Sequence, residues 1–275
     1  MYYDLNTKKI IKVKESKALK FLYNTLIGRI MLKIATTHFI ANLYAKYLNS
    51  KLSKHKIKKF IKKNNINMDE YENKEYNSFN DFFIRNIKSH KRNINDGLVA
   101  VCDSKLSIYK INKESTLKIK NSIYTIEELI QEKNTNYEYA LIFRLCVDDY
   151  HHYIFPDDGC VLSQKYIDGI LHTVQPIALK KHKVFTENSR CVTILDCKNL
   201  GKVCYIEVGA MIVGKIVNEK KISFKKGEEK GHFEFGGSTV VLLFEKDKIS
   251  INREILDNTK KDIETIVKLG DCIGR

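Results

Sequence analysis

The pattern of apolar residues predicts a helical first part and a strand-rich remainder. In residues 19–48, Leu22, Leu26, Ile30 and Ile34 recur at every fourth position, which places them on one side of a helix. Charged residues interrupt this stretch, so it contains no uninterrupted apolar run of membrane-crossing length. We therefore predict that residues 1–67 are mainly helical.

From residue 98 onward the apolar segments are short, rich in β-branched and aromatic residues, and bounded by Gly, Asn, Asp or charged residues, which is typical of strands. One helical turn is predicted at 124–132 with Thr125 as its N-cap. The tail after Thr259 is predicted to be a short helix and a closing turn. Many strands with few helices between them predict an α+β fold, with a mainly antiparallel β body after the helical region. The predicted strands lie within 98–111, 138–147, 191–197, 202–217 and 232–246.

The charge of the chain is concentrated in its helical part. The 275 residues carry 48 Lys and Arg against 33 Asp and Glu, a net charge of +15, and residues 1–67 hold 16 of the basic residues but only two acidic ones. A basic amphipathic segment suits an anionic membrane surface, where each Lys contributes about 1 kcal/mol. A helix packed on the body with a solvated basic face explains the same pattern equally well. No recognisable nucleic-acid-reading motif follows, so no nucleic-acid partner is expected.

The seven cysteines form no CxxC pair, and no Cys/His cluster has the spacing of metal ligands in the sequence. Neither a disulfide framework nor a zinc site is therefore expected, and we predict a reduced, cytoplasmic protein. The N-terminus also lacks the apolar stretch that is typical of a signal peptide.

Three groups of polar residues occur at positions where a strand would ordinarily be apolar or a loop would carry no reactive side chains. Residues 236–239 (GGST) interrupt a strand, which is typical of a β-bulge or of a strained backbone that presents a carbonyl to the next hydroxyl. Residues 148–153 (DDYHHY) place two histidines beside carboxylates at a strand end, which suits a general base. Asp103 lies in an apolar run, where it either starts a turn with Ser104 or, if buried, requires a partner such as a histidine.

In their order along the chain, these groups resemble the pyruvoyl-dependent phosphatidylserine decarboxylase family. The GGST motif is specific for the family only when the family's other segments occur with it in order, and all of them occur in this sequence. The matching segments are SFNDFFIR (78–85), CDSKLSIYKI (102–111), DDYHHY (148–153), GILHTVQPIAL (169–179), ENSR (187–190), EVGAMIVGKI (207–216) and KGHFEFGGSTVVLLF (230–244).

The resemblance implies a chain that cleaves itself. Ser238 attacks the carbonyl of Gly237 and turns the peptide bond into an ester. Elimination then separates residues 1–237 from 238–275 and leaves a dehydroalanine, which hydrolyses to a pyruvoyl group with loss of ammonia. A serine hydroxyl is a weak nucleophile, so the resemblance also assigns His151 as the base that takes its proton and Asp103 as the group that holds the imidazole in the right tautomer.

The sequence departs from the family's pattern at one of the histidines. Many members read D-Y-H-x-x-H, and the second histidine position is Ile154 here. His151 occupies the matching position and is the favoured base, with the neighbouring His152 as the alternative. On a strand the two side chains point to opposite faces, so only one is expected to reach Ser238. The roles of His172 and Arg190, in matching segments, stay open.

The resemblance implies decarboxylation of phosphatidylserine to phosphatidylethanolamine and CO2. The pyruvoyl ketone forms a Schiff base with the amine of the head group, and its conjugated carbonyl accepts the electrons released as CO2 leaves. The implied cofactor is thus the covalent pyruvoyl group derived from Ser238, with neither pyridoxal phosphate nor a metal.

An anionic lipid as substrate also gives the basic segment a purpose, and favours membrane docking. We expect residues 1–97 to form a membrane-facing region and connector, residues 98–275 to form the catalytic body, and the protein to be peripheral on the cytoplasmic face of the cell membrane. The expected partners are phosphatidylserine and the anionic membrane surface. The large chain (1–237) and the small chain (238–275) are also expected to form a heterodimer, and further dimerisation of that pair stays open.

Two other functions fit part of the pattern. One is a basic lipid-surface binding protein that does not cleave itself, and the other is a pyruvoyl-dependent decarboxylase of a soluble amino acid. Denaturing mass analysis tests the first, and a comparison of turnover on vesicles and on free amino acids tests the second.

Overall fold

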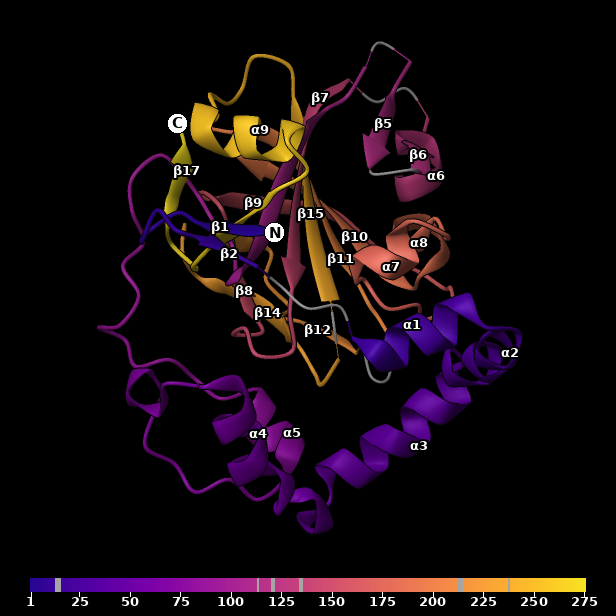
Figure 1. Ribbon diagram of the computed structural model, residues 1–275. Coiled ribbons are helices and arrows are strands. Elements are labelled where there is room, and N and C mark those ends of the chain that lie inside the picture. Colours follow the sequence, from indigo (N-terminus) through magenta and orange to yellow (C-terminus); the bar gives the residue numbers. More distant parts are fainter. Residues whose placement is uncertain (13–15, 113, 120–121, 134–135, 212–214, 237) are drawn as a thin grey trace.

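The computed structural model describes the whole chain except residues 13–15, 113, 120–121, 134–135, 212–214 and 237. It has a mainly antiparallel sheet body with helices gathered in the N-terminal part, so the predicted α+β class is confirmed. In Figure 1 the N-terminal helices lie together below one end of the body.

The body is organised around one large sheet. In the described part of the chain its strands follow the order β13-β9-β10-β11-β15-β7-β4-β16-β1-β2, and every neighbouring pair is antiparallel except β1 with β16. The strands are β13 (Ser223–Phe224), β9 (Gly159–Ile167), β10 (Arg190–Cys197), β11 (Gly201–Val208), β15 (Ser238–Glu245), β7 (Tyr137–Leu145), β4 (Ser104–Lys110), β16 (Glu264–Val267), β1 (Tyr2–Asp4) and β2 (Ile10–Ile11).

Smaller sheets flank the large one. One joins β12, β14 and β8, the next pairs β17 with β3, and a third pairs β5 with β6. Their bounds are β12 (Ile216–Asn218), β14 (Glu229–Phe233), β8 (His152–Ile154), β17 (Cys272–Gly274), β3 (Leu98–Val99), β5 (Thr116–Ile119) and β6 (Ser122–Thr125).

The helices begin at hydroxyl caps where the sequence supplies them. Ser16, Thr25 and Thr37 accept backbone N–H groups at the starts of the first three helices, and Thr125 caps α6 as predicted. The helices are α1 (Lys17–Asn24), α2 (Leu26–Ala35), α3 (His38–Asn49), α4 (Lys56–Asn64), α5 (Phe79–Phe83), α6 (Ile126–Ile130), α7 (Pro176–Leu179), α8 (Val184–Glu187) and α9 (Arg253–Lys260).

One local prediction was wrong, at the C-terminal end. The tail after Thr259 forms the strands β16 and β17, and the helix α9 precedes it, because the β-branched segment at 264–267 pairs with both β4 and β1. The first residues also form strands, with β1 parallel to β16, so the helices of the N-terminal region begin only at Lys17.

Both faces of the large sheet are buried at its centre. Along β15, the side chains of Val240, Leu242 and Phe244 belong to one hydrophobic cluster, and those of Val241 and Leu243 belong to another. This follows from the two-residue period of a strand, and it explains why the strand reads as a continuous apolar run.

The register brings the candidate residues to one end of the sheet. Ser238, the first residue of β15, pairs with Leu145, the last residue of β7, and on the other side of β7 Arg144 pairs with Lys105 near the start of β4. Asp103 directly precedes β4, and the DDYHHY segment follows β7. This end of the sheet faces the N-terminal helices in Figure 1.

Candidate active site

Ser238 stands at the start of a central strand with a buried hydroxyl. Its side chain has no exposed surface, and its Oγ has no hydrogen-bond partner among the described residues. Two residues earlier, Gly236 has φ of 149°, a backbone conformation that side chains disfavour. Gly237, the other half of the predicted cleavage site, lies outside the described residues, as does Gly214. A buried hydroxyl without a partner is costly in a stable fold and is typical of a reactive group.

His151 is held with one ring nitrogen fixed and the other without a partner. Its Nδ1 lies 2.8 Å from the backbone oxygen of Asp149, and because a carbonyl only accepts, Nδ1 carries the proton. Nε2 is then the unprotonated nitrogen, and it is buried with no hydrogen-bond partner in the part of the chain that the structure describes. Burial lowers the pKa of His151 to about 3, so the imidazole is neutral around pH 7. This is the state that a general base requires.

The segment before Ser238 packs against the surroundings of His151. The backbone N–H of Phe233 donates to the His151 carbonyl at 2.9 Å. The Phe83 ring of α5 lies 4.1 Å from the His151 ring and 4.9 Å from the Phe235 ring, measured between centroids. The short α5, from the SFNDFFIR motif, thus lies between the histidine and the residues that lead to the predicted cleavage site.

Asp103 is buried, which is the case in which the sequence predicted that it requires a partner. Its side-chain partners are cations, however, and not a histidine. Its carboxylate accepts from Lys268 Nζ at 2.8 Å, from the Leu269 backbone N–H at 2.8 Å and from Arg92 at 3.3 Å. The predicted hydrogen bond between Asp103 and His151 is therefore absent from the described structure, because the Asp149 carbonyl already occupies Nδ1.

Asp149 is a residue whose part in the site the sequence did not reveal. Both of its carboxylate oxygens lie 2.7 Å from Lys105 Nζ, and one of them accepts the Cys146 backbone N–H. Although burial alone would raise the pKa of Asp149, the Lys105 ammonium lowers it below the usual value. This buried ion pair fixes the turn whose carbonyl orients His151. The only sequence signal was the second acid of the DDYHHY motif.

His152, the alternative base, has both nitrogens engaged. Nδ1 lies 2.8 Å from Glu229 Oε1, and Nε2 lies 3.1 Å from the Ile84 carbonyl oxygen. His152 begins β8 and directly follows His151, so its partners lie in a different direction. These contacts favour His151 over its neighbour as the base.

The two residues whose roles the sequence left open have structural partners. Arg190 is buried and donates to four backbone carbonyls, those of Leu129, Glu128, Thr186 and Asn188. It thereby joins α6 to α8, and no described residue forms an ion pair with it. His172 is buried as well, with Nδ1 3.2 Å from the Tyr23 hydroxyl of α1.

Comparison with known proteins decides the family. The model of the family described as phosphatidylserine decarboxylase matches residues 79–275. The chain belongs to the phosphatidylserine decarboxylase family. The predicted family and the predicted enzyme class, a decarboxylase, are both confirmed.

Members of the phosphatidylserine decarboxylase family match almost the whole chain. "Phosphatidylserine decarboxylase proenzyme 2" of Clostridium acetobutylicum is 47% identical over 99% of this chain and 97% of its own length. A phosphatidylserine decarboxylase proenzyme of Clostridium tetani is 40% identical over 100% and 97%, and one of Fusobacterium nucleatum is 38% identical over 96% and 92%. These matches therefore also cover the N-terminal residues that precede the matched family region.

The buried neutral state of His151 predicts an acid-sensitive fold. Between its ordinary pKa of 6.5 and the folded value of about 3, the unfolded chain binds a proton that the folded chain does not. The free energy of unfolding should therefore fall as the pH drops through this window, by up to about 1.4 kcal/mol per pH unit from this group. Denaturant unfolding, measured in a Ser238→Ala background with and without His151→Gln, should show a smaller slope without the histidine. Equal slopes would contradict the buried neutral imidazole.

Proposed function

We propose that the chain is a proenzyme that cleaves itself between Gly237 and Ser238, and that the product decarboxylates phosphatidylserine to phosphatidylethanolamine on the cytoplasmic face of the cell membrane. The observation that carries the proposal is a pair of buried atoms, Ser238 Oγ and His151 Nε2, that have no hydrogen-bond partner among the described residues and lie at one end of the sheet in a chain of this family.

Maturation begins with proton transfer from the Ser238 hydroxyl to Nε2 of His151. Oγ then bonds to the carbonyl carbon of Gly237, and the carbon–nitrogen bond between the two residues breaks to give an ester. The Asp149 carbonyl keeps the proton of His151 on Nδ1, so that Nε2 stays available. Elimination and hydrolysis of the new N-terminal residue give the ketone and ammonia.

The residues around Ser238 suit a pyruvoyl group at this position. The group is small and stays within the volume that the serine occupied. The neighbouring Thr239 Oγ1 is another buried hydroxyl with no partner among the described residues, and it is able to donate to a new carbonyl. When present, the group supplies an electron sink for loss of CO2. In this reaction the chain binds the substrate and excludes water, and His151 is available to move a proton.

Asp103 enters the proposal as a positioning residue. Its carboxylate ties the start of β4 to Lys268 and Leu269, which follow β16. The start of β4 and the end of β16 lie beside the turn that carries Asp149. We infer that Asp103 affects maturation through this frame, and a direct role toward His151 stays a prediction.

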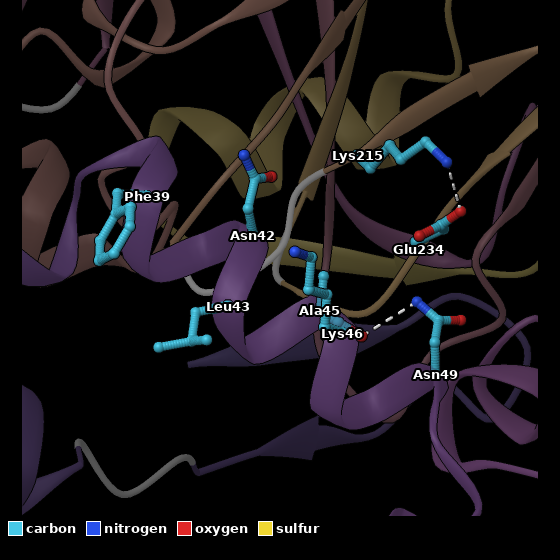
Figure 2. Close-up of a pocket in the computed structure, with 8 residues that line it drawn as sticks. All are labelled: Phe39, Asn42, Leu43, Ala45, Lys46, Asn49, Lys215 and Glu234. Carbon is cyan, nitrogen blue, oxygen red and sulfur yellow. Dashed lines mark hydrogen bonds and ion pairs between the residues drawn. The ribbon is translucent and has the colours of Figure 1, made fainter.

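A groove beside α3 provides a path from the surface toward the cleavage segment. Its volume is about 570 Å³, and one wall is the α3 face that carries Phe39, Leu43 and Lys46. The other wall holds Lys215 and Glu234, which form a 2.9 Å ion pair, and Glu234 lies four residues before Ser238 (Figure 2). Apolar side chains beside two ammonium groups suit the glycerol and phosphate part of an anionic phospholipid, so we propose that the head group enters here.

The membrane-facing surface is the outer side of α2 together with Phe39 and Leu43 of α3. Its apolar residues are exposed rather than packed on the body, by 72% at Leu26, 58% at Ile30 and 59% at Ile34. Exposed Arg29 and Lys33 lie among them. A large exposed apolar surface with cationic neighbours is typical of a helix that lies in the membrane interface. No helix in the described part of the chain meets the length and apolarity needed to cross a bilayer.

Membrane docking predicts a selective effect of two substitutions. Ile30→Glu with Ile34→Glu should weaken binding to phosphatidylglycerol vesicles at least ~100-fold, because each isoleucine loses about 2 kcal/mol of apolar burial. Ile222→Glu is the matched control, since Ile222 is 84% exposed on the body. Flotation or surface plasmon resonance measures the binding. Equal binding by the double variant and the wild type would contradict this docking surface.

Substrate preference tests the function itself. The protein should release CO2 from phosphatidylserine vesicles and leave free serine untouched, and under denaturing conditions it should run as two chains, 1–237 and 238–275. Turnover of free serine instead would support a decarboxylase of soluble amino acids. An intact chain that binds vesicles without turnover would support a binding protein.

A further inference from the structure

Two histidines and a glutamate converge on the far side of the strand that follows His151. His152 of β8 and His232 of β14 are paired across the antiparallel ladder, and Glu229 precedes His232 by three residues. Glu229 Oε1 lies 2.8 Å from His152 Nδ1 and 3.6 Å from His232 Nδ1. The rings of the two histidines are 5.0 Å apart between centroids.

These three groups present acceptors to one another. The carbonyl of Ile84 accepts from His152 Nε2, so Nε2 carries the proton of the neutral imidazole and Nδ1 is a lone pair. That lone pair faces the Glu229 carboxylate. His232 Nδ1 is buried in the same place, and no described residue forms a hydrogen bond with it. A cation between the three atoms would satisfy all of them, whereas a proton on His152 Nδ1 requires that this imidazole become charged.

We propose that His152, Glu229 and His232 bind a divalent transition-metal ion such as Zn²⁺. One ligand atom from each of the three residues lies within 4.8 Å of the other two, and we take these atoms to be His152 Nδ1, a Glu229 carboxylate oxygen and His232 Nδ1. Ligands of a tetrahedral zinc at about 2.0–2.1 Å are about 3.3 Å apart, so modest side-chain rotations close the site. Water completes the coordination.

The surroundings of the three residues suit a metal. The Ile84 carbonyl fixes the His152 ring through its outer nitrogen, as is usual for metal-binding histidines. Two imidazoles and one carboxylate are a donor set that zinc and its neighbours in the first transition series prefer.

A second cluster in the described residues, His172, His182 and Glu187, lacks this mismatch. The Tyr23 hydroxyl lies 3.2 Å from His172 Nδ1 and is able to donate to it, and in that tautomer His172 Nε2 bears a proton and faces Glu187 at 3.7 Å. Ordinary protonation therefore satisfies this cluster, and it serves as an internal control.

The metal site is independent of self-cleavage. All three ligands precede Gly237 and remain in the large chain, and neither ring nitrogen of His151 takes part. A Ser238→Ala chain should consequently bind the metal as the wild type does. A failure of metal binding would thus leave the proposed decarboxylase function untouched, and the reverse also holds.

Zinc titration of the full-length protein, stripped with a chelator and monitored by calorimetry or by competition with a chromophoric chelator, tests the site. We expect one equivalent to bind and the thermal midpoint to rise. His232→Asn and Glu229→Gln should each weaken binding at least tenfold, and Co²⁺ should give the intense visible spectrum of a four-coordinate site only with the ligands intact. His90→Asn, at an exposed histidine, and His182→Asn, in the second cluster, should bind as the wild type does.

The outcomes that overturn the proposal are equally defined. They are the absence of stoichiometric zinc binding by the wild type, unchanged affinity in Glu229→Gln, or loss of binding in His182→Asn. Glu229 is partly exposed, so its variant is expected to fold, and circular dichroism of each metal-free variant separates loss of a ligand from loss of structure.

Discussion

Replacing Ser238 by alanine will leave the 32.0 kDa chain in one piece and without decarboxylase activity. The methyl group has no oxygen to attack the Gly237 carbonyl, and no ketone can arise from alanine by elimination. The fold should tolerate the change, because the Ser238 hydroxyl is buried without a partner and its removal breaks no hydrogen bond among the described residues. Denaturing mass spectrometry and CO2 release from phosphatidylserine vesicles are the measurements.

Ser223→Ala is the matched control for this variant. Ser223 is an exposed serine at the start of β13, on the far edge of the same sheet, and its variant should mature and turn over like the wild type. Cleaved and active Ser238→Ala protein would refute the mechanism.

The second large expected effect distinguishes the roles of two adjacent histidines in self-cleavage. His151→Ala should slow self-cleavage by roughly 10²–10⁴-fold, the range that a positioned general base contributes. His152→Ala should cleave within a few-fold of the wild type, because both nitrogens of His152 are engaged elsewhere. The rate at which the 238–275 fragment appears after expression measures both.

The two variants serve as controls for each other, since they differ by one position and remove the same side chain. Stalled cleavage in His152→Ala with normal cleavage in His151→Ala would transfer the role of base to His152. Normal cleavage in both would remove histidine from the maturation step.

The sequence was sufficient for the features that local chemistry determines. The period of apolar residues predicted the helices near the N-terminus and the strands of the body, and Thr125 predicted the start of α6. Ordered motifs predicted the family. In each case the signal lies within a few neighbouring residues, and the local structure that it predicts is the one that forms.

What the sequence could not reveal depends on contacts between distant residues. Asp103 was predicted to require a partner, but Lys268 lies 165 positions away and no local pattern announces the pair. His152 and His232 likewise come together only through the pairing of β8 with β14, which is why spacing along the chain predicted no metal site. For the same reason the sequence did not predict whether Ile30 is exposed. The period of a helix shows which residues share a face, but it does not show what that face contacts.

The most direct test of the central claim is the chemical identity of the first group in the small chain. Mass spectrometry of the purified 238–275 fragment, before and after borohydride, should find an N-terminal pyruvoyl group that gains two hydrogens on reduction. A fragment that begins with an unmodified serine, or a preparation that holds only intact chain, would contradict the account.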